Sequence, residues 1–215
     1  MSEKTSIRVF IADDHAIVRE GLKQILAEQR DIVVAGEAET GLDAVKLFHK
    51  SRCNVLLLDI SLPDRNGIEV LKQIKDEKPD LAVLMLSMHR EDQYAIRALK
   101  AGAAGYMTKQ SAPKELVNAI RQVAAGQHYV SPQLAQVLAA QVGDGFDKPP
   151  HESLSDREYQ TLTMIASGKT VGEIAKELSL SVKTVSEYRS RLLAKMKLKT
   201  SAELTHYAIR NQLIE

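Results

Sequence analysis

The sequence predicts an α/β domain built on a doubly wound, five-stranded parallel sheet, followed by an all-α helix-turn-helix domain. Three observations support this fold class. The first 125 residues alternate β-rich runs with amphipathic stretches. Residues 55–58, Val-Leu-Leu-Leu, are apolar at every position, which is typical of a strand covered on both faces. Ser179-Leu180-Ser181 separates two helical patterns by a turn short enough for a helix-turn-helix.

Five strands and five helices are expected in alternation along the first domain. The predicted strands are Ile7–Ala12, Ile32–Ala38, Val55–Asp59, Ala82–Ser87 and Gly105–Thr108. The predicted helices, each with one apolar face, are Ile17–Glu28, Leu42–Lys50, Ile68–Glu77, Gln93–Lys100 and Lys114–Ala125. A succession of β–α units implies right-handed crossovers and a doubly wound sheet.

The chain divides at a change of pattern after residue 126. We assign residues 1–126 to the α/β domain, residues 127–153 to a linker and residues 154–215 to the helical domain. The linker carries a short predicted helix, Pro132–Val142, before a stretch rich in Gly, Pro and Asp. Four helices are predicted in the last domain: Asp156–Ala166, Val171–Leu178, Val182–Met196 and Ala202–Asn211.

Composition excludes several classes of protein. The sequence has no run of about 18 apolar residues that could span a bilayer, and it does not start like a secretory signal, so we expect a cytoplasmic protein without membrane contact. The lone Cys53 cannot form an internal disulfide. Residues 183–199 contain six Lys or Arg and one acid, Glu187. Such a cluster suits nucleic acid, although it is also common on solvated helix faces.

Acidic residues gather at predicted strand ends. Asp13 and Asp14 follow the first strand, and Asp59 ends the third. If these strands are neighbours, three carboxylates converge where a doubly wound sheet binds ligands. Their repulsion calls for a cation, and oxygen ligands favour Mg²⁺. The competing interpretation is that each Asp simply caps the helix that follows it.

Two further strand ends carry a hydroxyl and an ammonium group. Ser87 ends the fourth strand, and Lys109 follows the fifth. Facing three carboxylates, these groups could stabilise a phosphoryl group, since phosphoryl transfer mainly requires positioning and charge neutralisation. An Asp carboxylate can act as the nucleophile and become an aspartyl-phosphate.

Residues 7–125 resemble the response-regulator receiver domain, whose fold is flavodoxin-like. The resemblance rests on Asp13-Asp14, Asp59, Leu62-Pro63 with Gly67, Ser87, Gly102-Ala103 and Tyr106 with Lys109. It implies that Asp59 accepts a phosphoryl group from a sensor histidine kinase and that Lys109 contacts the phosphoryl oxygens. It also implies that Mg²⁺ is held by Asp14, Asp59 and the Ser61 carbonyl, with Asp13 acting through water. Ser87 and Tyr106 would then form the switch that responds to the phosphate.

The helix predicted at Val182–Met196 has two different faces. Val185, Leu192 and Met196 lie on one side. Lys183, Glu187 and Ser190 lie on the other, flanked by Ser186 and Arg191. Short polar side chains near the start of a helix, with basic ones around them, suit insertion into the major groove of DNA. A plain solvated face is the competing interpretation.

Residues 154–213 resemble the LuxR-type helix-turn-helix of the NarL/FixJ response regulators. The matching residues are Leu154-Ser155, Arg157-Glu158, Ala166, Gly168, Glu173-Ile174-Ala175, Leu178, Leu180-Ser181, Lys183-Thr184-Val185, Arg189, Lys195 and Leu198. The resemblance implies that Ser186, Glu187 and Ser190 face bases. It implies that Lys183, Thr184, Arg189, Arg191 and Lys195 contact the DNA backbone. The last helix would be the surface on which two such domains pair.

Taken together, the two resemblances imply a two-component response regulator. Phosphorylation of Asp59 would control formation of a homodimer and sequence-specific DNA binding, and thereby transcription. We expect no enzymatic activity beyond slow self-dephosphorylation. The alternative left open is a receiver whose helical domain binds a protein instead of DNA.

Overall fold

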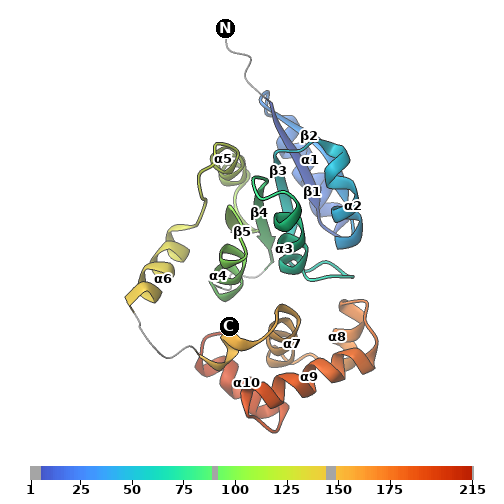
Figure 1. Ribbon diagram of the computed structural model, residues 1–215, viewed down its shortest axis with the longest axis vertical. Helices are drawn as coiled ribbons and strands as arrows, with labels where there is room; N and C mark the ends of the chain where they lie inside the picture. Colours follow the sequence, from blue (N-terminus) through green and yellow to red (C-terminus); the bar gives the residue numbers. More distant parts are fainter. Residues whose placement is uncertain (1–5, 89–91, 144–148, 215) are drawn as a thin grey trace. The chain divides into compact units, whose positions relative to one another are not determined.

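The computed structural model describes residues 6–88, 92–143 and 149–214 (Figure 1). The chain forms two compact units, residues 1–139 and residues 140–215, which are described separately below. Among these described residues, no helix is both long enough and apolar enough to cross a membrane.

The first unit is built on a five-stranded sheet in the order β2-β1-β3-β4-β5 (Figure 1). Every pair of neighbouring strands is parallel. The strands are β1 Ile7–Ala12, β2 Ile32–Ala38, β3 Val55–Asp59, β4 Ala82–Ser87 and β5 Gly105–Thr108. The order reverses between β1 and β3, which is where a doubly wound sheet opens a crevice for ligands. The predicted α/β fold class is therefore confirmed.

Helices cover both faces of the sheet, so every side chain of the central strand β3 is buried. The helices are α1 Ala16–Ala27, α2 Gly41–Ser51, α3 Gly67–Glu77, α4 Asp92–Lys100 and α5 Pro113–Ala124. One core cluster joins α1 and α5 to the sheet through residues such as Leu26, Leu57 and Ile120. Burial of this kind contributes about 25 cal/mol per Å² of apolar surface.

The predicted linker contains two helical elements, α6 Pro132–Gly143 and the short 3-10 helix η1 Pro150–Ser153. Its residues 144–148 lie outside the described part of the chain. Just before α6, Tyr129 runs alongside β5: its N–H donates to the Ala104 carbonyl at 2.9 Å, and its own carbonyl accepts from the Tyr106 N–H at 3.2 Å. The first unit therefore keeps ordered backbone pairing beyond residue 126, and the exact domain boundaries stay a prediction.

The second unit is helical throughout its described elements, as predicted. It comprises η1 and the helices α7 Asp156–Ala166, α8 Val171–Glu177, α9 Val182–Met196 and α10 Ser201–Arg210. A side-chain oxygen caps the start of each of these four helices, from Ser155, Thr170, Ser181 and Thr200. The turn between α8 and α9 places Ser179 at a φ of 52°. On α9, which follows this turn, residues of one side such as Lys183 and Ser186 are exposed.

Candidate phosphoryl-acceptor site and nucleic-acid interface

The acidic residues lie together at the carboxyl edge of the sheet. Strands β1 and β3 are neighbours, with Ala12 opposite Leu58, so the residues that end them, Asp13 and Asp59, are adjacent. Lys109 follows β5, and its N–H donates to the Ser87 carbonyl at the end of β4 at 2.7 Å. The parallel sheet thus brings four strand ends to one small site.

Lys109 joins two of the carboxylates. Its Nζ lies 2.7 Å from Asp13 Oδ2 and 2.7 Å from Asp59 Oδ2. All three side chains are buried, with exposed fractions of 3%, 0% and 1% for Lys109, Asp13 and Asp59. A charged group so far from water needs a charged partner to stay ionised, and each of these has one.

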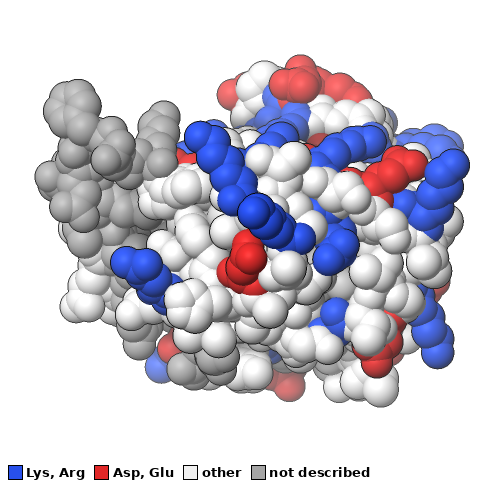
Figure 2. Space-filling model, turned by 90° about the horizontal axis from the view of Figure 1, so that it is seen from below, with Lys and Arg blue, Asp and Glu red and all other residues white. Residues whose placement is uncertain are grey.

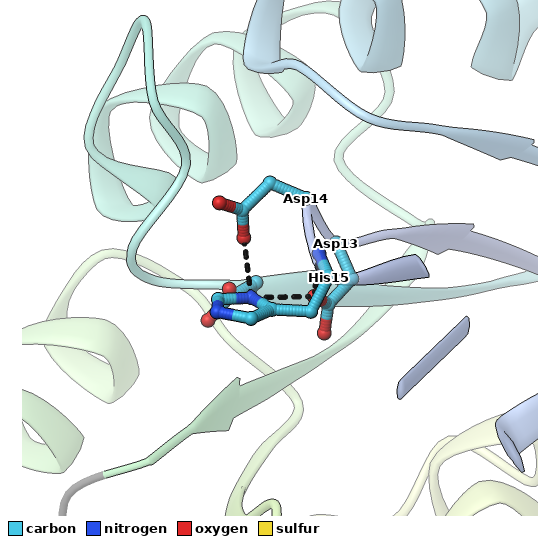
Figure 3. Close-up of side chains that lie close together, drawn as sticks. Asp13, Asp14 and His15 are labelled. Atoms are coloured by element: carbon cyan, nitrogen blue, oxygen red, sulfur yellow. Dashed lines mark hydrogen bonds and ion pairs between the residues drawn. The ribbon is translucent and has the colours of Figure 1, made fainter. Parts of the chain in front are cut away.

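Asp14 and His15 complete the cluster on its open side (Figure 3). The His15 ring nitrogen Nδ1 lies 2.7 Å from Asp14 Oδ1 and 3.3 Å from Asp13 Oδ1. The side chains of Asp14 and His15 are 31% and 56% exposed, in contrast with the buried Asp13. Asp13, Asp14, His15 and Asp59 each present a potential metal-binding atom, and these atoms all lie within 4.8 Å of one another.

The charges of this cluster fit a divalent cation. Three carboxylates against one ammonium leave an excess of two negative charges when His15 is neutral. Two buried oxygens, Asp13 Oδ2 and Asp14 Oδ1, accept no well-directed hydrogen bond from the described residues, although Lys109 and His15 lie 2.7 Å from them. Carboxylate oxygens with spare acceptor capacity are the ligands that Mg²⁺ prefers.

Burial and neighbouring charges shift the pKa values of the central pair. Burial raises the pKa of the Asp59 carboxyl, Lys109 opposes this rise and the Asp13 charge adds to it, with a raised pKa as the result. Burial acts to lower the pKa of Lys109, but Asp59 and Asp13 outweigh burial and raise it. Lys109 therefore stays protonated, whereas its charge offsets only part of the cost of burying an ionised Asp59.

The loop after β3 folds back onto Asp59. The Ser61 N–H donates to Asp59 Oδ1 at 3.2 Å, and Ser61 pairs with Asn66 in an isolated antiparallel bridge. Asn66 Oδ1 accepts from the Ile68 N–H at 2.8 Å and so caps α3. At Gly67 an added Cβ would lie 2.1 Å from the Asp59 carbonyl oxygen, so glycine is required there.

The two predicted switch residues are both buried. Ser87, at the end of β4, is 1% exposed, and Tyr106 in β5 is 5% exposed. Tyr106 stands opposite Met85 in the sheet register. The roles of Ser87 and Tyr106 in a switch stay predictions.

The exposed side of α9 carries five of the residues predicted to contact DNA. Lys183, Ser186, Glu187, Ser190 and Arg191 line a shallow hollow on this helix. All five are exposed, whereas Val185, Leu192 and Met196 on the opposite side are buried. Figure 2 shows a face of the molecule on which Lys and Arg side chains lie spread among uncharged and acidic ones. The division of α9 into two faces follows the sequence prediction.

The other residues predicted to contact the DNA backbone have partners within the unit. Lys195 Nζ lies 2.6 Å from Glu158 Oε2, and Arg189 Nε donates to Ser201 Oγ at 2.9 Å. Thr184 Oγ1 lies 2.8 Å from the capping Ser181 Oγ. On the exposed face, Arg191 is 3.6 Å from Glu187. Lys183 is therefore better placed for phosphates than Lys195, whose charge Glu158 offsets, or Arg191, which lies beside Glu187.

Comparison with known proteins decides the family. Residues 9–121 match the response regulator receiver domain, and residues 152–208 match the bacterial regulatory proteins of the luxR family. The response regulator UvrY of Escherichia coli (strain K12) is 41% identical over 208 residues, which cover 96% of this chain and 95% of that protein. The response regulator GacA of Pseudomonas aeruginosa is 39% identical over 213 residues, with 97% and 98% covered. The chain belongs to the response regulators.

Solved structures agree with this assignment. The response regulator RcsB of Salmonella typhimurium is 28% identical in sequence, and its structure superposes with a TM-score of 0.69. The match covers 94% of this chain and 96% of the RcsB chain. Another RcsB structure, described as bound to promoter rprA in the presence of the phosphomimetic BeF₃⁻, has a TM-score of 0.65 at 28% identity. The resemblance to receiver and LuxR-type domains that the sequence predicts is thus confirmed.

Some residues of this response regulator contribute to the two sites without having been predicted. His15 belongs to the acidic cluster, and its position directly after Asp13-Asp14 was the available signal. Glu158 is one of the residues that match the LuxR-type domain, but nothing in the sequence indicated that this residue of α7 pairs with Lys195 of α9. The ligand set of the metal and the individual DNA contacts stay predictions.

Proposed function

We propose that this response regulator accepts a phosphoryl group on Asp59 from a sensor histidine kinase, and that phosphorylation controls its dimerisation and DNA binding. The observation that carries the proposal is the position of Lys109, whose Nζ lies 2.7 Å from both Asp13 and Asp59 at the carboxyl edge of the sheet. Because DNA is the proposed target, we expect the protein to act in the cytoplasm.

The proposed chemistry needs one nucleophile and compensating charge. An Asp59 carboxylate oxygen forms the new bond to phosphorus while the bond from phosphorus to the donor breaks. Lys109 lies where its ammonium can neutralise a phosphoryl oxygen. Asp14, Asp59 and the Ser61 carbonyl would hold Mg²⁺, with Asp13 acting through water, and the cation would supply further neutralisation. Slow self-dephosphorylation is the only turnover we expect.

Phosphorylation would change the conformation of Ser87 and Tyr106 and thereby the protein surface near β4 and β5. A phosphoryl group on Asp59 gives the Ser87 hydroxyl a new hydrogen-bond acceptor, and Tyr106 on the neighbouring strand would respond to that movement. The phosphate can shift the balance of two states only by its differential interaction with them, commonly about 1–3 kcal/mol. A shift of this size is enough to control pairing of two chains.

The DNA-binding proposal rests on α9 and α10. The exposed face of α9 presents Ser186, Glu187 and Ser190 for bases, with Lys183 and Arg191 beside them for phosphates. On α10, Ile209 is 59% exposed, which suits a surface for pairing. RcsB, a relative of similar fold, has been solved as two dimers bound to two parallel DNAs. Two paired units would read half-sites about one helical turn apart.

Substitutions on α9 should separate phosphate contacts from base contacts. Lys183→Ala or Arg191→Ala should weaken binding to all DNA and lower the salt slope by about one counterion each. Lys195→Ala should have a smaller effect on the slope, because Glu158 already offsets this charge. Changing Ser186, Glu187 or Ser190 should instead alter sequence preference by about 1–3 kcal/mol per base pair.

Fluorescence anisotropy with a selected site and with random DNA, each at several salt concentrations, measures both effects. Uniform losses from both groups of variants on both DNAs would show that α9 does not enter the groove as proposed. Salt-independent or absent DNA binding by the phosphorylated protein would favour a protein-binding output domain instead.

A further inference from the structure

Arg19 of α1 contacts the backbone of the acidic cluster at Asp13. Its side chain is 7% exposed, and its Nη1 donates to the main-chain carbonyl of Asp13 at 2.8 Å. Its Nε donates to Glu37 Oε2 at 3.3 Å, and its Nη2 pairs with the carboxylate of Glu39. One guanidinium therefore ties the turn after β1 to the end of β2.

Asp13 is fixed from its other side as well. Its N–H donates to the Ala38 carbonyl of β2 at 3.1 Å, and its Oδ1 accepts from the His15 N–H at 2.9 Å. With Arg19 on its carbonyl, the peptide groups on both sides of Asp13 are held. These bonds set the direction of the Asp13 carboxylate and of the Asp14 residue that follows. Arg19 bonds to the Asp13 carbonyl and not to the carboxylates of Asp13 or Asp14, so its influence on the cluster passes through the backbone.

We infer that Arg19 is a positioning residue that holds the turn from Asp13 to His15 in the geometry needed to bind a divalent cation. The inference rests on the proposed function of the acidic cluster. The planar guanidinium has several donors in a fixed fork, so it can hold a carbonyl and two carboxylates at once. Groups that orient metal ligands in this indirect way commonly contribute about tenfold or more to metal affinity.

The direction in which Arg19→Ala changes cation affinity distinguishes a positioning role of Arg19 from a purely electrostatic one. Removing the positive charge of Arg19 would make the surroundings of the cluster more negative, which by Coulomb attraction alone would tighten cation binding. Loss of positioning predicts weaker binding. The two explanations therefore predict opposite changes for the same substitution, Arg19→Ala.

Lys23 provides a matched control on the same helix. Its Nζ contacts the same acidic partner, Glu37, at 3.1 Å and also contacts Glu20 at 2.5 Å. Unlike Arg19, Lys23 does not bond to Asp13. Lys23→Ala therefore removes one positive charge from the same ion-pair network and leaves the Asp13 backbone held.

The experiment is a titration of the full-length chain with MgCl₂, followed by amide chemical shifts, for wild type, Arg19→Ala, Arg19→Lys and Lys23→Ala. We expect Arg19→Ala to weaken Mg²⁺ binding by about tenfold. Arg19→Lys, with a single ammonium in place of the fork, should lie between wild type and Arg19→Ala. Lys23→Ala should bind as tightly as wild type or slightly more tightly. Labelling by acetyl phosphate at saturating Mg²⁺ should recover toward the wild-type rate in Arg19→Ala.

Mg²⁺ binding by Arg19→Ala that equals or exceeds that of wild type would overturn the inference, as would an equal loss in Lys23→Ala. If Arg19→Ala fails to fold, Arg19→Lys decides: weaker binding supports positioning, and unchanged binding overturns it. The titration uses no phosphoryl donor. Failure of the proposed function would appear separately, as an unlabelled wild type or a labelled Asp59→Asn.

Discussion

Replacing Asp59 with Asn should abolish incorporation of a phosphoryl group from acetyl phosphate in the presence of Mg²⁺. The amide keeps the size of the side chain but lacks the carboxylate nucleophile. Asp13 also contacts Lys109, so loss of labelling in this variant would show that Asp13 does not take over as the acceptor. Intact-mass spectrometry measures the labelled fraction. Asp76→Asn, an exposed acid at the end of α3, is the matched control and should label like wild type.

The same variant should not lose stability when Mg²⁺ is absent. Folding raises the pKa of Asp59, so at neutral pH the buried carboxylate costs stability in the metal-free protein. A neutral amide removes that cost, and thermal unfolding should occur at the wild-type temperature or above it.

Asp14→Ala should keep the acceptor but require more Mg²⁺ for labelling. Stoichiometric labelling of Asp59→Asn would show that another residue is the acceptor.

Gly67→Ala should destabilise the first unit and impair labelling together. An added Cβ would lie 2.1 Å from the Asp59 carbonyl oxygen and 2.8 Å from Ile60 Cα, both backbone atoms that cannot turn aside. Forcing such a contact commonly costs about 1–3 kcal/mol, and here the strain falls on the acceptor residue itself. Urea unfolding and the labelling rate of the same sample measure both consequences.

Gly21→Ala is the control for this substitution. Gly21 lies within α1, and apart from its chain neighbours and the helix's own backbone no atom comes within 4 Å of an added Cβ. Replacing a helical glycine by alanine commonly stabilises by about 0.5–1 kcal/mol. We therefore expect the same change, glycine to alanine, to lower the free energy of unfolding at position 67 and to raise it at position 21. A Gly67→Ala protein as stable as wild type would contradict the packing of the loop around Asp59.

The sheet and the acidic site could be predicted from the sequence because their signals are local. Strands β1, β3 and β4 are short, mainly apolar runs, and Asp13, Asp59 and Ser87 stand at or directly after their ends. Once strands are parallel neighbours, their carboxyl ends meet without further information. The same reasoning separated the buried Val185 and Leu192 of α9 from its exposed face.

Contacts between distant segments could not be predicted in this way. Pairing of Lys195 with Glu158 depends on how α9 crosses α7, which the sequence of α9 does not contain. The same holds for Arg19, whose partners Glu37 and Glu39 come from another strand and its following loop. Tyr129 aligns with β5 although its surroundings resemble a linker, because the open edge of a sheet accepts any extended backbone.

We propose that dimerisation connects the acceptor site to the DNA interface. We expect the unphosphorylated chain to be mostly monomeric and the phosphorylated chain to be dimeric, which sedimentation velocity can measure. Residues 150–215 alone should bind DNA without any phosphoryl donor, because we expect the unphosphorylated receiver to be what suppresses their binding. Joining two weakly binding units raises their apparent affinity without any new contact to DNA.

DNA affinity of the full-length protein, with and without acetyl phosphate and Mg²⁺, tests control by Asp59 most directly. Wild type and Asp59→Asn should be compared on the same selected DNA site at one salt concentration. A coupling of about 1–3 kcal/mol corresponds to an affinity gain of about 5- to 150-fold. We predict a gain of this size for wild type and none for Asp59→Asn. Equal DNA affinity of wild type in both states would contradict control of DNA binding by phosphorylation.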